Sequence, residues 1–395
     1  GTASTLFEGV IADCHNLSRT NEKNFKSQIL KAPYVKRWLP LADSMSGAKN
    51  KVFATQHAKT LEEKLDILWR FSQVCKKELG SGKTDAGAGQ RKAKCSEPWI
   101  EMSQKRGGVD TSKADILVGG KQTSVKGPSA QLMSGEQKET KATIIAALAT
   151  TKVSKELEKT LLSEVDKFVT NSRTKGAEIT SGALKKMTVQ QAKETGNEDV
   201  KELLDSQEKG KAAIRKTFED AFKDSKVGTA FAYEAMTGYE KFGGKAYPKR
   251  KAGDAIGEAT HMLIWDYRMD RMKLQKIDSA FSAKTAKKMN IRPDLKSSSY
   301  DIKGVKSGYN FYQAMRVSVG VFLDQQGKVV TEAQAALDDS NRLLAEGNLT
   351  ELELKRVKSF ITKTMQMFRE KVLSLWNNLV SKITEIVEKA RAFFE

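Results

Sequence analysis

An acid, a serine and a lysine stand close together in one short segment of the chain. Asp115 lies in the apolar run 114–118, and Ser124 and Lys126 follow in the next run, after the pair Gly119-Gly120. Gly-Gly between two short aliphatic runs indicates a two-residue β-hairpin turn. Because side chains alternate along a strand, Ser124 and Lys126 point to the same face, and Asp115 can face them across the turn.

This arrangement suits phosphoryl chemistry. A carboxylate such as Asp115 holds Mg²⁺ (or Mn²⁺), which proteins bind through one or two carboxylates together with water and phosphate. The metal polarises the phosphate and generates hydroxide. A lysine such as Lys126 stabilises charge or orients the attacking water. The same hairpin also arises in α+β proteins in which both charges are simply solvated, so the spacing alone leaves that reading open.

The whole segment 112–135, SKADILVGGKQTSVKGPSAQLMSG, resembles the core of the PD-(D/E)xK nuclease superfamily. That core is an acid, a turn, and an acid-x-lysine strand, and the SAQLMSG that follows is similar to variants in tailed-phage and restriction-type proteins. In this resemblance Asp115 matches the first acid and Lys126 the lysine. Ser124 occupies the place of the second acid. A serine is a poor Mg²⁺ ligand, so either Gln131 or a migrated acid compensates, or catalysis is lost.

The resemblance extends over roughly residues 1 to 320. The family often supplies a further acid from an early helix, and LFEGVIA at 6–12 fits that helix with Glu8 as the metal-ligand candidate. An acid on an amphipathic helix is also commonly an ordinary surface residue. Weaker matching blocks are EAMTGYEKF at 234–242, the apolar run 261–265, and the segments 296–299 and 309–316. The fold implied is α+β (α/β), a restriction-endonuclease-like mixed central sheet flanked by helices.

Two functions follow from this resemblance. The first is a Mg²⁺-dependent DNA endonuclease-like protein of a tailed-phage virion, which hydrolyses phosphodiester bonds. The second is a catalytically inactive, DNA-binding structural protein inside the capsid or at the portal or tail, which Ser124 favours. Gly1 and the ending Phe393-Phe394-Glu395 resemble products of T-even-type prohead proteases. We therefore expect a location in the capsid interior, with delivery to the host cytoplasm, or otherwise a cytoplasmic protein.

The charge of the chain favours a polyanionic partner. The net charge is +19 over 395 residues, and residues 331–395 hold ten basic and ten acidic side chains, so the whole excess lies in residues 1–330. A basic body favours DNA through release of counterions, although excess lysine also serves solubility. Candidate contact stretches are 91–94, 105–106, 245–251 and 268–276.

Several other classes of site are disfavoured. No run of 18 apolar residues exists, so we expect no membrane insertion. Three cysteines without CxxC spacing and three histidines argue against a zinc site and a disulfide scaffold. The motif GSGKT at 80–84 resembles the end of a phosphate-binding P-loop, but the required earlier glycine is Lys77 and a helical run precedes it. We interpret it as a loop after a helix C-terminus.

The resemblance implies a nuclease-like domain over 1–330. The residue pattern predicts a helical insertion within it at about 140–225 and a C-terminal helical hairpin over 331–395. Helices are expected at 4–17 and 57–79, the second with a core stripe that starts at Leu61. Residues 80–113 are expected to form a loop, and 260–277, 288–297 and 309–320 to form strands. From Ile361, apolar residues recur close to a heptad, which predicts a long helix. It would serve self-association, docking to other virion proteins, or packing on its own body.

Overall fold

The structure is a computed structural model. By its contacts the chain divides into two units, Gly1–Leu323 and Asp324–Glu395. The described residues are 3–45, 53–127, 131–135, 137–149, 151, 153–180, 198–243, 256–266, 268–287, 290–302, 305–318, 322–323 and 329–330. For residues 4, 5, 90, 131, 133–135, 172–180, 198–204, 206–207 and those from 290 onward, the description covers the backbone alone.

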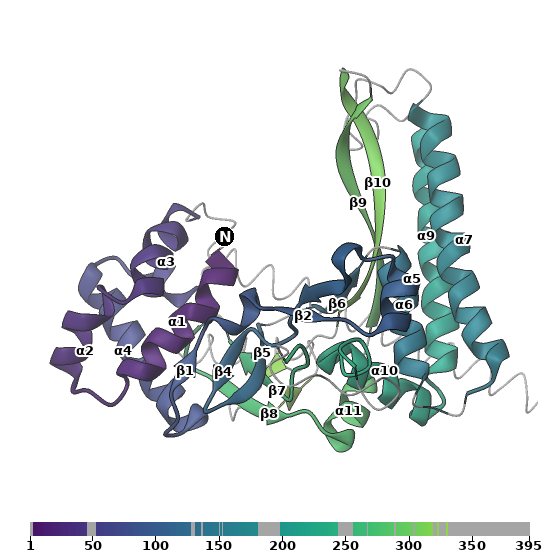
Figure 1. Ribbon diagram of the computed structural model, residues 1–395. Helices are drawn as coiled ribbons and strands as arrows, with labels where there is room; N and C mark the ends of the chain where they lie inside the picture. The colour runs from purple at the N-terminus through teal and green to yellow at the C-terminus, as the bar shows by residue number, and fades with distance from the viewer. Residues whose placement is uncertain are drawn as a thin grey trace, which may run out of the picture. The chain divides into compact units, whose positions relative to one another are not determined.

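A mixed five-stranded sheet with the order β1-β4-β5-β7-β8 lies at the centre of the first unit (Figure 1). Strands β4 and β5 form the antiparallel hairpin that the Gly119-Gly120 pair predicts, and both glycines have positive φ. Strand β5 pairs in parallel with β7, which pairs antiparallel with β8. The strands are β1 (Thr84–Asp85), β4 (Ile116–Val118), β5 (Lys121–Lys126), β7 (His261–Trp265) and β8 (Met272–Lys276).

Helices from the first 79 residues pack against this sheet in one hydrophobic core. The aromatic ring of Phe7 lies 4.2 Å from that of Trp265 on β7, centroid to centroid, and 5.6 Å from that of Phe71. All three side chains are buried, so the contact fixes the first helix against the sheet. The elements are α1 (Ala3–Leu17), α2 (Glu22–Ile29), α3 (Pro33–Ser44), the 3₁₀ turn η1 (Ala54–Gln56) and α4 (Leu61–Leu79).

Helix α4 begins four residues later than the predicted start at 57. Thr60 caps it, because its side chain accepts from the N–H of Glu63 and the Glu63 carboxylate accepts from the N–H of Thr60. The expected core stripe holds for Leu65 and Leu68, which are buried. It does not hold for Leu61, which is 52% exposed, because the first turn extends beyond the core.

The segment 80–113 is not the loop that its glycine and lysine content predicts. Its short strands form only by pairing with distant or neighbouring segments: β1 with β4, and β2 with β3. Local propensity carries little information about such short, pairing-dependent strands. The elements are β2 (Lys92–Lys94), α5 (Glu97–Ser103), β3 (Val109–Thr111) and the 3₁₀ turns η2 (Ala88–Gln90) and η3 (Arg106–Gly108).

A second sheet, of order β6-β10-β9, holds the strands expected near 288–297 and 309–320 (Figure 1). Its hairpin pairs Ser318 with Asn290 at one end and Val305 with Ile302 at the other. Helices α7 and α9 lie side by side, and α10 contacts α6 and α11. The elements are β6 (Gln131–Gly135), α6 (Gln137–Leu148), α7 (Lys155–Thr180), α9 (Glu198–Ala221), α10 (Ser225–Thr237), α11 (Ser279–Ala286), β9 (Asn290–Ile302), β10 (Val305–Ser318), β11 (Phe322–Leu323) and β12 (Val329–Val330).

The chain is therefore an α+β protein with a mixed sheet, as predicted at that level. The predicted C-terminal helical hairpin over 331–395 lies outside the described residues. In the described part, none of the helices has the length and apolarity needed to span a lipid bilayer.

Candidate active site

Asp115 lies at the mouth of the β4–β5 hairpin, where its carboxylate is held by the opposite strand. The N–H of Val125 donates to Oδ2 at 2.6 Å, and the hydroxyl of Ser124 donates to the same oxygen at 3.1 Å. The N–H of Asp115 donates to the carbonyl of Thr123 at 2.9 Å, which aligns the two strands. Among the described residues no donor is bonded to Oδ1, which leaves that oxygen available to a ligand.

Lys126 ends β5 beside this carboxylate. Its Nζ lies 3.8 Å from Oδ2 of Asp115, and the two side chains are 20% and 21% exposed. The hairpin therefore brings together Asp115, Ser124 and Lys126, the three residues that the sequence singles out. Ser124 is 1% exposed and serves as a donor to Asp115, a contact that an acid at this position would turn into repulsion between like charges.

Glu8 reaches the same place from helix α1, 107 positions earlier in the chain. Burial, followed by the negative charge of Asp115, raises the pKa of Glu8 to about 8, although the positive charge of Lys126 opposes the shift. Its neighbour Phe7 is buried in the aromatic core, so α1 has little freedom to withdraw Glu8 from the hairpin. Two carboxylates and one ammonium thus share a partly buried site.

A glycine of η2 allows the two acids to lie this close. A methyl group on Gly89 would lie 3.3 Å from the Cα and carbonyl oxygen of Asp115 and 3.6 Å from Oε2 of Glu8. The N–H of Gly89 also donates to the carbonyl of Asp115 at 3.0 Å. The turn therefore packs directly over the site, and a side chain at this position would reach both acids.

The side-chain chemistry fits a divalent cation of the Mg²⁺ type. Such ions use one or two carboxylates and keep several waters, and Glu8 and Asp115 supply two. Burial and the second carboxylate raise the pKa of Glu8 because both disfavour its ionised form. A bound cation would stabilise that ionised form. Within the described residues, no group of three or more His, Cys, Asp or Glu side chains is arranged to hold a metal ion. Glu8 and Asp115 are thus a two-carboxylate set, and no third acid joins them in that part of the chain.

Gln131, the candidate substitute for the missing acid, begins β6, and its side chain lies outside the described part of the chain. Lys113 is the residue that sequence reasoning missed. Its Nζ donates to the carbonyls of Leu132 and Ala235, both at 2.9 Å, and so ties β6 and the end of α10 to the segment that carries Asp115. Burial, with help from two neighbouring lysines, lowers the pKa of Lys113 to about 7. Its place two residues before Asp115 was the available signal.

Much of the basic sequence that seemed free to contact a partner is engaged within the chain. Arg91 pairs with Asp85 at 3.1 Å, and Lys105 pairs with Glu139 at 2.7 Å. Arg271 pairs with Asp266. The stretch 245–251 lies outside the described residues. The sequence-predicted contact stretches are therefore partly structural ion pairs.

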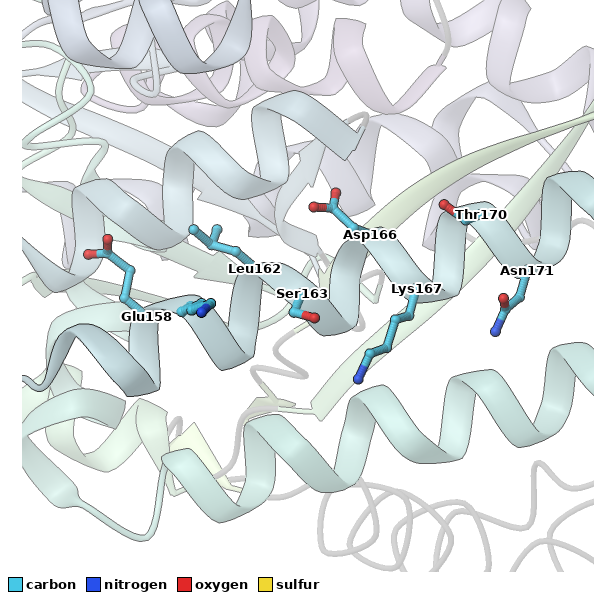
Figure 2. A pocket seen from close by; sticks show the side chains of 8 residues that line it. Glu158, Leu162, Ser163, Asp166, Lys167, Thr170 and Asn171 are labelled. Carbon is cyan, nitrogen blue, oxygen red and sulfur yellow. The ribbon is translucent and has the colours of Figure 1, made fainter.

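A pocket of about 610 Å³ lies along α7 and is separate from these residues (Figure 2). Asp166 on its rim accepts from Nζ of Lys141 and from Nε2 of Gln137, each at 2.7 Å. Lys167 pairs with Glu164 one turn earlier at 2.7 Å. None of the sequence-predicted site residues lines this pocket, and Asp166 on its rim is engaged in contacts with helix α6.

Comparison with models of protein families, with curated proteins and with solved structures finds no match to this chain.

Proposed function

We propose that the chain is a Mg²⁺-dependent deoxyribonuclease of the PD-(D/E)xK type. The observation that carries the proposal is the meeting of Glu8, Asp115 and Lys126 at one end of the β4–β5 hairpin, from two segments far apart in the sequence. The resemblance of segment 112–135 to that superfamily also supports it. A place inside the virion of a tailed phage belongs to the same proposal and rests on that resemblance alone.

The residues divide the work as follows. Glu8 and Asp115 would hold the cation, which when bound polarises a phosphate and lowers the pKa of its water. Ser124 and the N–H of Val125 orient Asp115 by binding Oδ2, so that neither of them occupies the other oxygen. Lys126 supplies a positive charge beside the carboxylate, where it stabilises the charge that develops on the phosphate.

The test is cleavage of supercoiled plasmid and linear DNA by the full chain in Mg²⁺ or Mn²⁺. Wild type is compared with Asp115→Ala and Lys126→Ala. The matched controls are Asp205→Ala and Lys155→Ala, two exposed helix positions. We expect cleavage by wild type and both controls, and none by either site variant. Cleavage that survives Asp115→Ala would refute the assignment of the site.

A second candidate function is a DNA-binding virion component that has lost catalysis. Ser124 in the place of an acid favours it, as does the two-carboxylate metal set. A Ser124→Asp variant separates the two candidates. Under the first function this variant weakens or abolishes an activity that wild type has, because it inserts a third charge where Asp115 needs a donor. Under the second, wild type binds DNA without cutting it, and Ser124→Asp has no cleavage to lose.

A further inference from the structure

The end of the central sheet that carries the hairpin turn presents a row of basic side chains. Strand pairing places them: β1 begins at the turn because Thr84 pairs with Val118, and Val118 pairs with Lys121. On the far side, Thr123 pairs with His261, and His261 pairs with Lys276. We call these four residues the basic row: Lys83, Lys121, His261 and Lys276.

The motif GSGKT contributes the first member of the row. The N–H of Gly119 donates to the carbonyl of Lys83 at 3.0 Å, so this loop lies against the hairpin turn. A methyl on Gly82 would lie 2.7 Å from the Cα of Gly119, a contact too close for any other residue without movement. The motif therefore acts as a packed loop that carries a lysine to the end of the sheet, whereas a P-loop would follow a strand.

Within the described part of the chain, no ion pair neutralises the lysines of the row. Lys83, Lys121 and Lys276 are exposed, and among the described residues no carboxylate forms an ion pair with them. The nearby acids are used elsewhere: Glu78 pairs with Lys273 at 3.2 Å, and Asp278 caps α11 by accepting from the N–H of Phe281.

The positive side chains of the row repel one another, and an anionic partner would reduce this repulsion. Burial, and then the positive charges of Lys121 and Lys276, lower the pKa of His261, so both lysines act on the same ring. Nδ1 of that ring lies 2.9 Å from the hydroxyl of Thr260, which donates to the carbonyl of Gln122. The ring is therefore held in place between its two basic neighbours.

We propose that the basic row binds the phosphate backbone of duplex DNA, at a surface separate from Asp115 and without reading sequence. Strands lie roughly 4.8 Å apart, so the four steps from β1 to β8 span roughly 19 Å. That length corresponds to roughly five to six base-pair steps along the axis of a duplex. Lys121 and Lys126 stand at opposite ends of β5, roughly 17 Å apart, so DNA on the row lies within reach of the candidate active site.

A row of charges without an apolar face favours DNA over a lipid surface. Membrane-surface segments combine basic residues with an apolar face. The exposed large hydrophobic residues of the described part are Leu61 and Ile256, and neither belongs to the row. The proposal goes beyond DNA cleavage, because it assigns a contact surface that does not depend on the metal.

The experiment measures binding of the full chain to a fluorescent duplex of about 20 base pairs in EDTA, at about 50 to 200 mM NaCl. The row variant is Lys83→Gln/Lys121→Gln/Lys276→Gln. The control, Lys155→Gln/Lys167→Gln/Lys223→Gln, removes the same charge from lysines that each pair with an acid three positions away in the sequence. We expect the row variant to bind at least about tenfold more weakly and to reduce the salt slope by about three, and the control to lose much less.

Equal losses in the two triple variants would overturn the proposal, because net charge alone would then explain binding. So would a wild-type chain that does not bind duplex DNA, or a row variant that loses only its binding to phosphatidylserine vesicles or to an acidic protein. A Lys→Arg triple, which keeps the charge, should restore affinity and guards against a folding defect. A chain that binds DNA through the row but never cleaves it refutes the nuclease proposal and leaves this one standing.

Discussion

The two ends of strand β5 differ in how their charged side chains are arranged. At the Lys126 end, an ammonium and the two carboxylates of Glu8 and Asp115 converge, partly buried and held by defined hydrogen bonds. At the Lys121 end, like charges stand exposed in a row without ion pairs in the described part of the chain. The first arrangement holds a few atoms in the fixed positions that catalysis needs. The second provides a positive potential that attracts a phosphate backbone of any sequence.

The largest expected effect separates these two ends. Asp115→Asn should lower DNA cleavage at least about 100-fold, because the site loses a charged ligand and its fixed geometry. Binding of duplex DNA in EDTA should change by less than about threefold, because the basic row is untouched. Gel-based cleavage and fluorescence anisotropy on the same preparation measure both. A parallel loss of cleavage and affinity would show that the two ends act as one surface.

Two acids close together at the Lys126 end should make the stability of the folded chain depend on pH. The pKa of Glu8 is about 8 in the folded chain, above its ordinary value of 4.5, so the folded state binds more protons than the unfolded state between these pH values. Wild-type stability should therefore fall as pH rises from about 5 to 8. Glu8→Gln should escape this fall and gain on the order of 2–3 kcal/mol relative to wild type over the same range.

Urea denaturation in EDTA at several pH values measures this difference. Mg²⁺ should reduce the advantage of Glu8→Gln at pH 8, because a cation stabilises the ionised pair of acids in wild type. A difference between the two proteins that stays constant with pH would contradict the burial of Glu8 beside Asp115.

The contribution of Lys113 to stability should change with pH in the opposite direction, and over a higher pH range. Its pKa is about 7 in the folded chain and 10.5 ordinarily, so the unfolded state binds more protons between these values. The free energy of unfolding of wild type should rise with pH from about 7 to 10. For Lys113→Met, this rise should be smaller by on the order of 2 kcal/mol. The same substitution at the exposed Lys223 serves as the control in urea denaturation. Parallel pH curves for wild type and Lys113→Met would count against the burial of this amine.

The smallest expected effect tests how the basic row is assembled. Gly82→Ala pushes a methyl against the backbone of Gly119 and must displace the GSGKT loop or the hairpin turn. We expect a loss of about 1 kcal/mol in stability and about a twofold loss of duplex affinity, without loss of cleavage per bound complex. Thermal unfolding and anisotropy measure these effects, with the exposed Ser81→Ala as control. An unchanged affinity would mean that Lys83 does not depend on this contact.

Sequence reasoning succeeded where short-range rules are strong. The Gly-Gly pair predicts the β4–β5 hairpin, and alternation predicts that Asp115, Ser124 and Lys126 share one end of it. It failed over 80–113, because strands of two or three residues exist only through their partners. It also did not predict that the candidate contact residues Arg91 and Lys105 form ion pairs with Asp85 and Glu139, because these pairs form only once the chain has folded.

The sequence by itself determined the hairpin, the chemistry of its side chains and the excess of positive charge, because these depend on composition and on neighbours along the chain. The tertiary structure decided which distant groups join them. It brought Glu8 from α1 to Asp115, and it locked Lys113 to carbonyls of β6 and α10. It also brought together the members of the basic row, which lie up to 193 positions apart in the sequence. Burial and pairing between distant segments determine these pKa values and this surface. Local sequence does not predict burial or long-range pairing.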